Sequence, residues 1–99
     1  MRLKDQHIFV TGGADGIGRA VVQDVADAGA KVSFCDLNVE KGRAYESELR
    51  AGGHRAFFVE GNVGSVAQME AVHSAITKEF GDVQGLVNNA GRNAYYDPV

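Results

Sequence analysis

The chain has 99 residues, of which 44% are hydrophobic and 23% charged, and its formal net charge is −3. This length suits one domain, which we predict over 1–99. No basic block is present that could follow a phosphate backbone, so nucleic-acid binding by bulk electrostatics is not expected. The single cysteine excludes an internal disulfide and a cysteine-rich zinc site.

Membrane and metal partners are not expected either. No stretch approaches the ~18 apolar residues that a spanning helix needs, and the apolar run at 8–10 is too short for an export signal. We therefore expect a cytoplasmic protein. His7, His54 and His73 are scattered along the chain without a ligand spacing, so no metal site is predicted.

Short apolar runs alternate with helical stripes along the chain. The run 7–11 predicts a strand, and apolar positions at helical spacing predict a helix over 16–28, ended by Gly29. The tail 92–99 has no periodicity and is predicted to be irregular. The remaining predicted elements are strands at 31–36, 55–60 and 83–88, and helices at 39–51 and 66–80 that are capped by Asn38 and Ser65.

This alternation predicts an α/β fold with a parallel sheet and helices on both faces. Right-handed crossovers wind the first three strands one way, and a fourth strand on the far side of the first gives the order 3-2-1-4. Ligands bind such sheets outside the carboxyl ends of the strands, at the switch point between strands 1 and 4. Phe57 and Phe58 are adjacent in a strand and so point to opposite faces, which suits a sheet covered on both sides.

A glycine-rich turn, Thr-Gly-Gly-Ala-Asp-Gly-Ile-Gly over 11–18, joins the first strand to the first helix. Glycines at this place let backbone N–H groups close on a pyrophosphate, and the helix dipole favours the negative charge. The spacing G-x-G-x-x-G does not fit, whereas G-x-x-x-G-x-G fits through Gly12, Gly16 and Gly18. A glycine-rich turn without a ligand is the alternative interpretation.

Asp36 ends the second predicted strand, 18 residues after Gly18. An acidic residue about 20 residues beyond such a turn binds the adenosine ribose hydroxyls in dinucleotide folds. Its carboxylate also repels a 2′-phosphate, no basic residue follows at 37 or 38, and Asp15 occupies a position where a basic residue could hold that phosphate. The sequence therefore predicts NAD rather than NADP, while a cap of the second helix is an alternative or additional role for Asp36.

Together these motifs resemble the N-terminal part of the short-chain dehydrogenase/reductase family. The glycine-rich turn, the acidic end of strand 2, Asn-Val at 62–63 and Asn-Asn-Ala-Gly at 88–91 occur in the family's order. The resemblance covers about 3–93. It implies a Rossmann-like fold, NAD as the cofactor, and hydride transfer between NAD and an alcohol or carbonyl carbon.

The resemblance also implies which residues contact the cofactor. The turn would surround the pyrophosphate and adenosine ribose, the ends of strands 2 and 3 would hold ribose and adenine, and the end of strand 4 would line the central part. In that order the residues are Gly12, Asp15, Gly16, Ile17 and Gly18; Asp36 and Leu37; Asn62 and Val63; and Asn89, Ala90 and Gly91. Asn88 would help fix strand 4 beside strand 1, and Cys35 is expected to be a buried, unreactive thiol.

Catalytic residues cannot be assigned in this chain. The family uses a Tyr-x-x-x-Lys pair and a serine on the fifth strand to move the substrate proton. None of Tyr45, Tyr95 and Tyr96 has a lysine four residues on, and the chain is truncated before the family's catalytic segment. We expect this 99-residue chain to bind the adenosine half of NAD weakly and to be inactive by itself.

Three other functions stay open. The chain could be a non-catalytic nucleotide-binding or oligomerising module, or one half of a split enzyme completed by a second polypeptide. A methyltransferase on the same sheet is disfavoured by the Thr-Gly start and by Asn-Asn-Ala-Gly. Without the family's fifth strand and further helices, strand 4 would be an open apolar edge and one face would carry only the third helix, so a homo-oligomer covering either is predicted.

Overall fold

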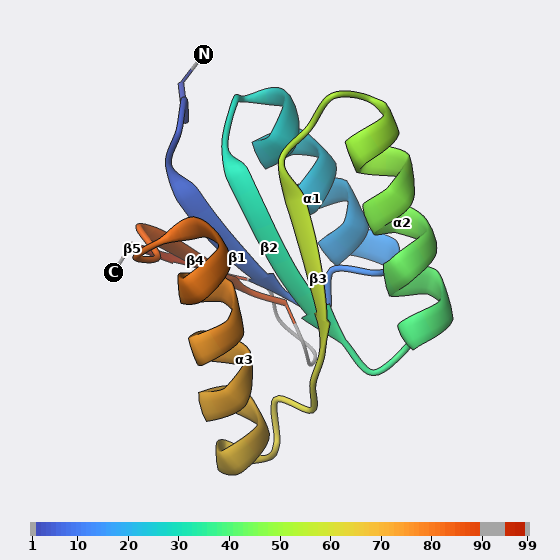
Figure 1. Ribbon diagram of the computed structural model, residues 1–99, viewed down its shortest axis with the longest axis vertical. Coiled ribbons are helices and arrows are strands. Elements are labelled where there is room, and N and C mark those ends of the chain that lie inside the picture. The colour runs from blue at the N-terminus through green and yellow to red at the C-terminus, as the bar shows by residue number, and fades with distance from the viewer. Residues whose placement is uncertain (1, 90–94, 99) are drawn as a thin grey trace.

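The strands form one sheet in the order β3-β2-β1-β4-β5 in the computed structural model, which describes residues 2–89 and 95–98 (Figure 1). The first four strands are parallel, whereas β5 pairs antiparallel with β4. The predicted order 3-2-1-4 is therefore confirmed. The strands are β1 (His7–Thr11), β2 (Lys31–Asp36), β3 (Ala56–Glu60), β4 (Gly85–Asn88) and β5 (Tyr95–Pro98).

Helices cover both faces of this sheet, as the alternation predicts. Helices α1 (Gly16–Asp27) and α2 (Val39–Ala51) lie on one face, and α3 (Val66–Phe80) lies on the other (Figure 1). Asn38 and Ser65 cap α2 and α3 through their side-chain oxygens, as predicted. Within 2–89 and 95–98, no helix is long and apolar enough to cross a membrane.

Two apolar cores lie on the two sides of the sheet. Phe58 belongs to the core under α1 and α2, whereas Phe57 packs toward α3, so the predicted opposite orientation of these neighbours is confirmed. Each fully buried aliphatic or aromatic side chain contributes about 1.5–3 kcal/mol, so both cores matter to stability. The core under α1 and α2 includes Ile8, Val10, Val22, Val32, Phe34, Tyr45 and Leu49, and the smaller core under α3 contains Phe9, Cys35, Val72 and Ile76.

Strand β4 is shorter than predicted, because it begins at Gly85 rather than at 83. The side chain of Gln84 takes part in the pairing at that point: its Oε1 accepts a hydrogen bond from the His7 backbone N–H at 2.6 Å. The Gln84 backbone N–H in turn donates to the His7 carbonyl at 2.8 Å. The Gln84 side-chain oxygen thus accepts a hydrogen bond that a backbone carbonyl would accept in a regular ladder.

The prediction of an irregular tail over 92–99 is wrong for Tyr95–Pro98, which forms β5. The edge of a strand presents unpaired backbone N–H and C=O groups, and any extended segment can satisfy them whatever its apolar pattern. Strand β5 lies along the edge of β4, in a register that sets Gly85 opposite Pro98 and Asn88 opposite Tyr95. The expectation of an open strand-4 edge is therefore also wrong.

A buried histidine connects the end of α3 to the sheet. His7 Nδ1 lies 2.9 Å from the Gly81 carbonyl oxygen, and Nε2 lies 2.7 Å from Ser33 Oγ. A carbonyl only accepts, so Nδ1 donates to Gly81, and in the neutral imidazole that burial favours Nε2 then accepts from the serine hydroxyl. Burial lowers the pKa of His7 below its ordinary value of 6.5, and the ring also packs edge-on against Phe80 at 5.4 Å between centroids.

We predict that the chain loses stability as the pH falls below 6.5, the value at which His7 takes up a proton in the unfolded chain. The neutral ring is favoured in the folded state, so its contribution is fully present above 6.5 and is lost toward the lower pKa of the folded state. Urea unfolding at pH of about 7.5 and about 5.5 measures the change. In the variant His7→Gln, the free energy of unfolding should change less between these two pH values. An equal change in both proteins would contradict the role given to His7.

Candidate dinucleotide-binding site

A hollow of about 290 Å³ opens at the carboxyl edge of the sheet. Its walls come from the segments that follow β1, β2, β3 and β4, so residues far apart in sequence meet at one place. It includes the place between β1 and β4 where an open parallel sheet binds its ligands. The predicted contact residues that line it are Gly12, Asp36, Leu37, Asn62, Val63 and Asn89.

Two structural reasons explain why the motif has glycine at three positions, namely a left-handed backbone and close packing. Gly12 and Gly16 have φ of 67° and 57°, a left-handed backbone that side chains disfavour. Gly18 is required by close packing, because a Cβ there would lie 1.8 Å from the Gly12 carbonyl oxygen and 2.4 Å from Asn89 Nδ2. The Asn89 amide also donates to that carbonyl at 3.1 Å. The first turn of α1 is therefore held directly against the end of β1.

The first turn of α1 carries Gly16, Ile17 and Gly18, and with Asp15 these predicted contacts lie outside the lining of the hollow. The first N–H groups of a helix have no acceptor within the helix, so this turn is suited to an anion. Asp15 Oδ1 accepts the Gly16 N–H at 2.9 Å and caps the helix. The structure thus separates the predicted residues into a hollow and an adjoining helix end.

Asp36 joins the loops that follow β1 and β2. Its Oδ2 accepts the backbone N–H of Ala14 at 3.1 Å, and its Oδ1 accepts that of Asn38 at 3.0 Å. A carboxylate has about four acceptor positions, so further donors can still be accommodated. Asn38, and not Asp36, provides the side-chain cap of α2, which corrects the alternative role considered for Asp36.

Asp15 forms an ion pair across these same loops. Its Oδ2 lies 2.8 Å from Lys41 Nζ at the start of α2. The Lys41 ammonium, with a further hydrogen bond from Gly16 N–H, holds the pKa of the Asp15 carboxyl below its usual value. Both side chains are more than half exposed, so the pair is solvated and easily broken.

Apolar side chains are exposed around the hollow. Among the described residues, the exposed large hydrophobic side chains are Ile17 (69%), Leu37 (65%), Val63 (41%) and Val66 (76%). The first three are predicted cofactor contacts. Single exposed apolar residues are ordinary, but three at one edge of a sheet provide a surface that a flat aromatic ring can cover.

Two lining residues were missed by the sequence interpretation: Cys35 and Gly61. Each directly precedes a predicted contact residue, and this position next to a contact is the feature of the sequence that could have indicated them. Burial raises the pKa of the Cys35 thiol to about 11, which keeps it protonated at neutral pH and agrees with the expected unreactive thiol. At Gly61 a Cβ would lie 2.6 Å from Val72 of α3, so this glycine lets the chain pass close to the helix.

The end of β4 is fastened to β1 by Thr11. Its hydroxyl donates to Asn88 Oδ1 at 3.0 Å and accepts the Asn89 backbone N–H at 2.9 Å. The predicted role of Asn88 beside strand 1 is therefore confirmed. Ala90 and Gly91 lie outside the described residues.

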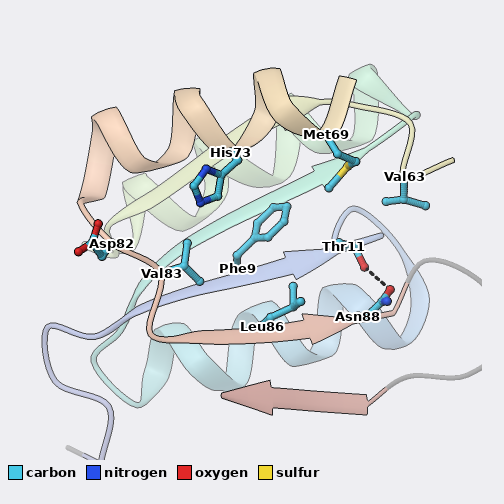
Figure 2. Close-up of a pocket in the computed structure, with 9 residues that line it drawn as sticks. All are labelled: Phe9, Thr11, Val63, Met69, His73, Asp82, Val83, Leu86 and Asn88. Atoms are coloured by element: carbon cyan, nitrogen blue, oxygen red, sulfur yellow. Dashed lines mark hydrogen bonds between the residues drawn. The ribbon is translucent and has the colours of Figure 1, made fainter. Parts of the chain in front are cut away.

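A second hollow, of about 530 Å³, lies on the α3 side of the sheet. Figure 2 shows Phe9 and Leu86 on neighbouring strands pointing toward α3, with Met69 and His73 pointing back from that helix. Helix α3 packs on β2 and β3, which leaves this part of β1 and β4 incompletely covered. Val63 lines both hollows, so the two adjoin at the carboxyl edge.

Comparison with known proteins agrees with this fold. The family model described as short chain dehydrogenase matches residues 6–97. The chain is 41% identical over 90 residues to the 3-beta-hydroxysteroid dehydrogenase of Comamonas testosteroni, and the matched region covers 91% of this chain and 34% of that protein. It is 37% identical over 98 residues to the L-fucose dehydrogenase of Rattus norvegicus, and here the matched region covers 99% of this chain and 34% of that protein.

Solved structures give the same result. A short-chain dehydrogenase/reductase of Serratia marcescens superposes with a TM-score of 0.87 at 29% identity, over 94% of this chain and 38% of that one. A variant of the actinorhodin polyketide ketoreductase with NADPH gives 0.82 at 34% identity, over 93% and 36% of the two chains. The open parallel sheet and glycine-rich turn define a Rossmann-like domain. The chain belongs to the short-chain dehydrogenase family, and it spans about a third of the length of the curated relatives it matches.

We predict that Gly18→Ala costs more stability than Gly16→Ala. The first substitution forces a methyl group into the Gly12 carbonyl and should cost about 1–3 kcal/mol or more. The second meets no atom within 4 Å and pays only for a left-handed backbone, about 1 kcal/mol. Urea unfolding of both variants measures the difference, and equal losses would show that the close approach at Gly18 is not constraining.

Proposed function

We propose that this chain binds NAD in the hollow at the carboxyl edge and forms the cofactor-binding part of an oxidoreductase. The observation that carries the proposal is the convergence of six predicted contact residues on one hollow, in a chain of the short-chain dehydrogenase family. NAD supplies the hydride chemistry, accepting a hydride from an alcohol carbon or, when reduced, giving one to a carbonyl carbon.

The binding mode follows from the chemistry of the lining. Leu37 and Val63 offer apolar surface to the adenine, and Asn62 offers an amide for its amino group. Asp36 accepts from the ribose hydroxyls while its bonds to two backbone N–H groups keep it oriented. Ile17 and Gly18, in the first turn of α1, would bind the pyrophosphate through their backbone N–H groups. Asn89 lines the central part of the cofactor.

NAD is preferred over NADP in this proposal. Asp36 places a negative charge where the ribose 2′-position would lie, and a 2′-phosphate there would be repelled. The relative crystallised with NADPH is a different protein, and its cofactor does not decide the preference of this chain. No tyrosine of the chain has a lysine four residues on, so we propose that the 99-residue chain binds the cofactor but oxidises no alcohol by itself.

We test adenosine binding by substituting two exposed hydrophobic residues, one that lines the hollow and one that does not. The variant Leu37→Ser removes apolar surface from the hollow, whereas Val66→Ser removes it from the exposed start of α3, outside the hollow. In calorimetric titrations with NAD we expect Leu37→Ser to weaken binding about three- to tenfold, and Val66→Ser to leave it unchanged. No heat at millimolar NAD with the unmodified chain would contradict the proposed function.

We also propose that the chain forms a homo-oligomer. Since β5 pairs with β4, the surface available for it is the α3-side face, where Phe9, Val83 and Leu86 line the larger hollow. Apolar surface of this kind is stabilised when a second copy covers it. This interface and the nucleotide hollow adjoin at Val63.

Light scattering tests the self-association. We expect a mass above that of one chain at micromolar concentration, and Leu86→Glu should return it toward the monomer because a charge would have to be buried in the interface. Val66→Glu places the same charge on an exposed position of α3 and serves as the control. A monomeric mass of the unmodified chain at these concentrations would contradict the proposal.

A further inference from the structure

Lys41 lies at the start of α2, shortly after Asp36 and Leu37, which line the proposed nucleotide hollow. Its backbone N–H donates to Asn38 Oδ1 at 3.0 Å, which fixes it in the first turn of α2. Its ammonium lies 2.8 Å from Asp15 Oδ2, on the neighbouring loop, and its side chain is 53% exposed. A lysine so held has a fixed base and a flexible four-carbon stem, so the charge can move while the backbone does not.

The carboxylate that would bind the ribose lies within the same pair of loops. Asp36 Oδ2 accepts the N–H of Ala14, the residue next to Asp15, and its Oδ1 accepts that of Asn38. The two loops are thus joined twice, once by Asp36 and once by the ion pair of Asp15 with Lys41. The Lys41 ammonium and the Asp36 carboxylate that we propose to bind the ribose are therefore held by the same pair of loops.

We infer that Lys41 is a specificity-determining residue for this cofactor, and that Asp15 withholds its ammonium from a ribose 2′-phosphate. The inference rests on the proposed function, because it concerns the same nucleotide. With Asp15 present, a 2′-phosphate meets two carboxylates and a cation that is already paired. Without the Asp15 charge, the ammonium is available to the phosphate, and the discrimination against NADP weakens.

Arg19 is a further cation near this end of α1, and it is engaged by other residues. Its Nη2 lies 2.9 Å from Glu48 Oε2, and its guanidinium stacks 4.2 Å from the centre of the Tyr45 ring. The pair of Lys41 with Asp15 is solvated, so breaking it costs at most about 1 kcal/mol. A doubly charged phosphate can supply that from a new charge-assisted hydrogen bond.

The experiment compares NAD with NADP, which differ by one phosphate, in calorimetric titrations of the 99-residue chain. The variant Asp15→Asn removes the charge and keeps a good helix cap, since asparagine is as favourable as aspartate at that position. Asp5→Asn is the matched control. It removes the same charge from a similar exposed ion pair, Asp5 with Arg55 at 2.7 Å, which lies at the opposite, amino-terminal edge of the sheet.

We expect Asp15→Asn to raise the affinity for NADP relative to NAD about five- to tenfold, and Asp5→Asn to leave that ratio unchanged. Adding Lys41→Met to Asp15→Asn should abolish the gain, and raised salt should reduce it. A ratio in Asp15→Asn within twofold of the unmodified chain, with NAD still bound, would overturn the inference alone. The same gain in Asp5→Asn, or in the double variant Asp15→Asn with Lys41→Met, would also overturn the inference. Absence of NAD binding by the unmodified chain would overturn the proposed function, and this inference with it.

Discussion

The carboxylate of Asp36 joins two of the loops from which the site is built, those after β1 and β2. Strands β1 and β2 are parallel neighbours, so their carboxyl ends lie side by side, but the loops beyond them have no ladder of their own. Asp36 supplies acceptors for Ala14 on one loop and Asn38 on the other. A charged group is thereby kept at the rim, hydrogen-bonded on both oxygens and oriented before any ligand arrives.

Stability and binding are separated in this fold. The two cores lie under the helices, and the buried His7 fastens the far end of α3 through Gly81 and Ser33. The carboxyl edge, by contrast, carries left-handed glycines and exposed Ile17, Leu37 and Val63. These are features that a chain selected for stability alone would avoid, and such local departures are expected where a ligand binds.

Much of the fold could be predicted because it depends on local pattern. The strand–helix alternation sets the parallel order, and the adjacency of Phe57 and Phe58 places them on opposite faces. Contacts between distant segments leave no periodic trace. Strand β5 follows from an open edge rather than from its own pattern, and the Gln84 bond to His7 crosses 77 positions.

The same distinction applies to the site. Glycine spacing and an acid at the end of β2 can be recognised in the sequence, since each belongs to one segment. The ion pair of Asp15 with Lys41 could not be predicted, because it depends on how closely α2 begins beside α1. Gly13 is a further example: a Cβ there would lie 2.6 Å from Phe34 Cβ, so core packing requires a glycine that the motif leaves free.

We propose that the ends of the parallel strands form one nucleotide site at the carboxyl edge. Amide NMR of the isotope-labelled chain during titration with NAD tests this site directly. We expect the shifted signals to belong to 12–18, 36–37, 62–63 and Asn89, and the signals of the Asp5 and Arg55 edge to stay unchanged. Shifts confined to the larger hollow around Phe9, Val83 and Leu86, or no shifts at millimolar NAD, would contradict it.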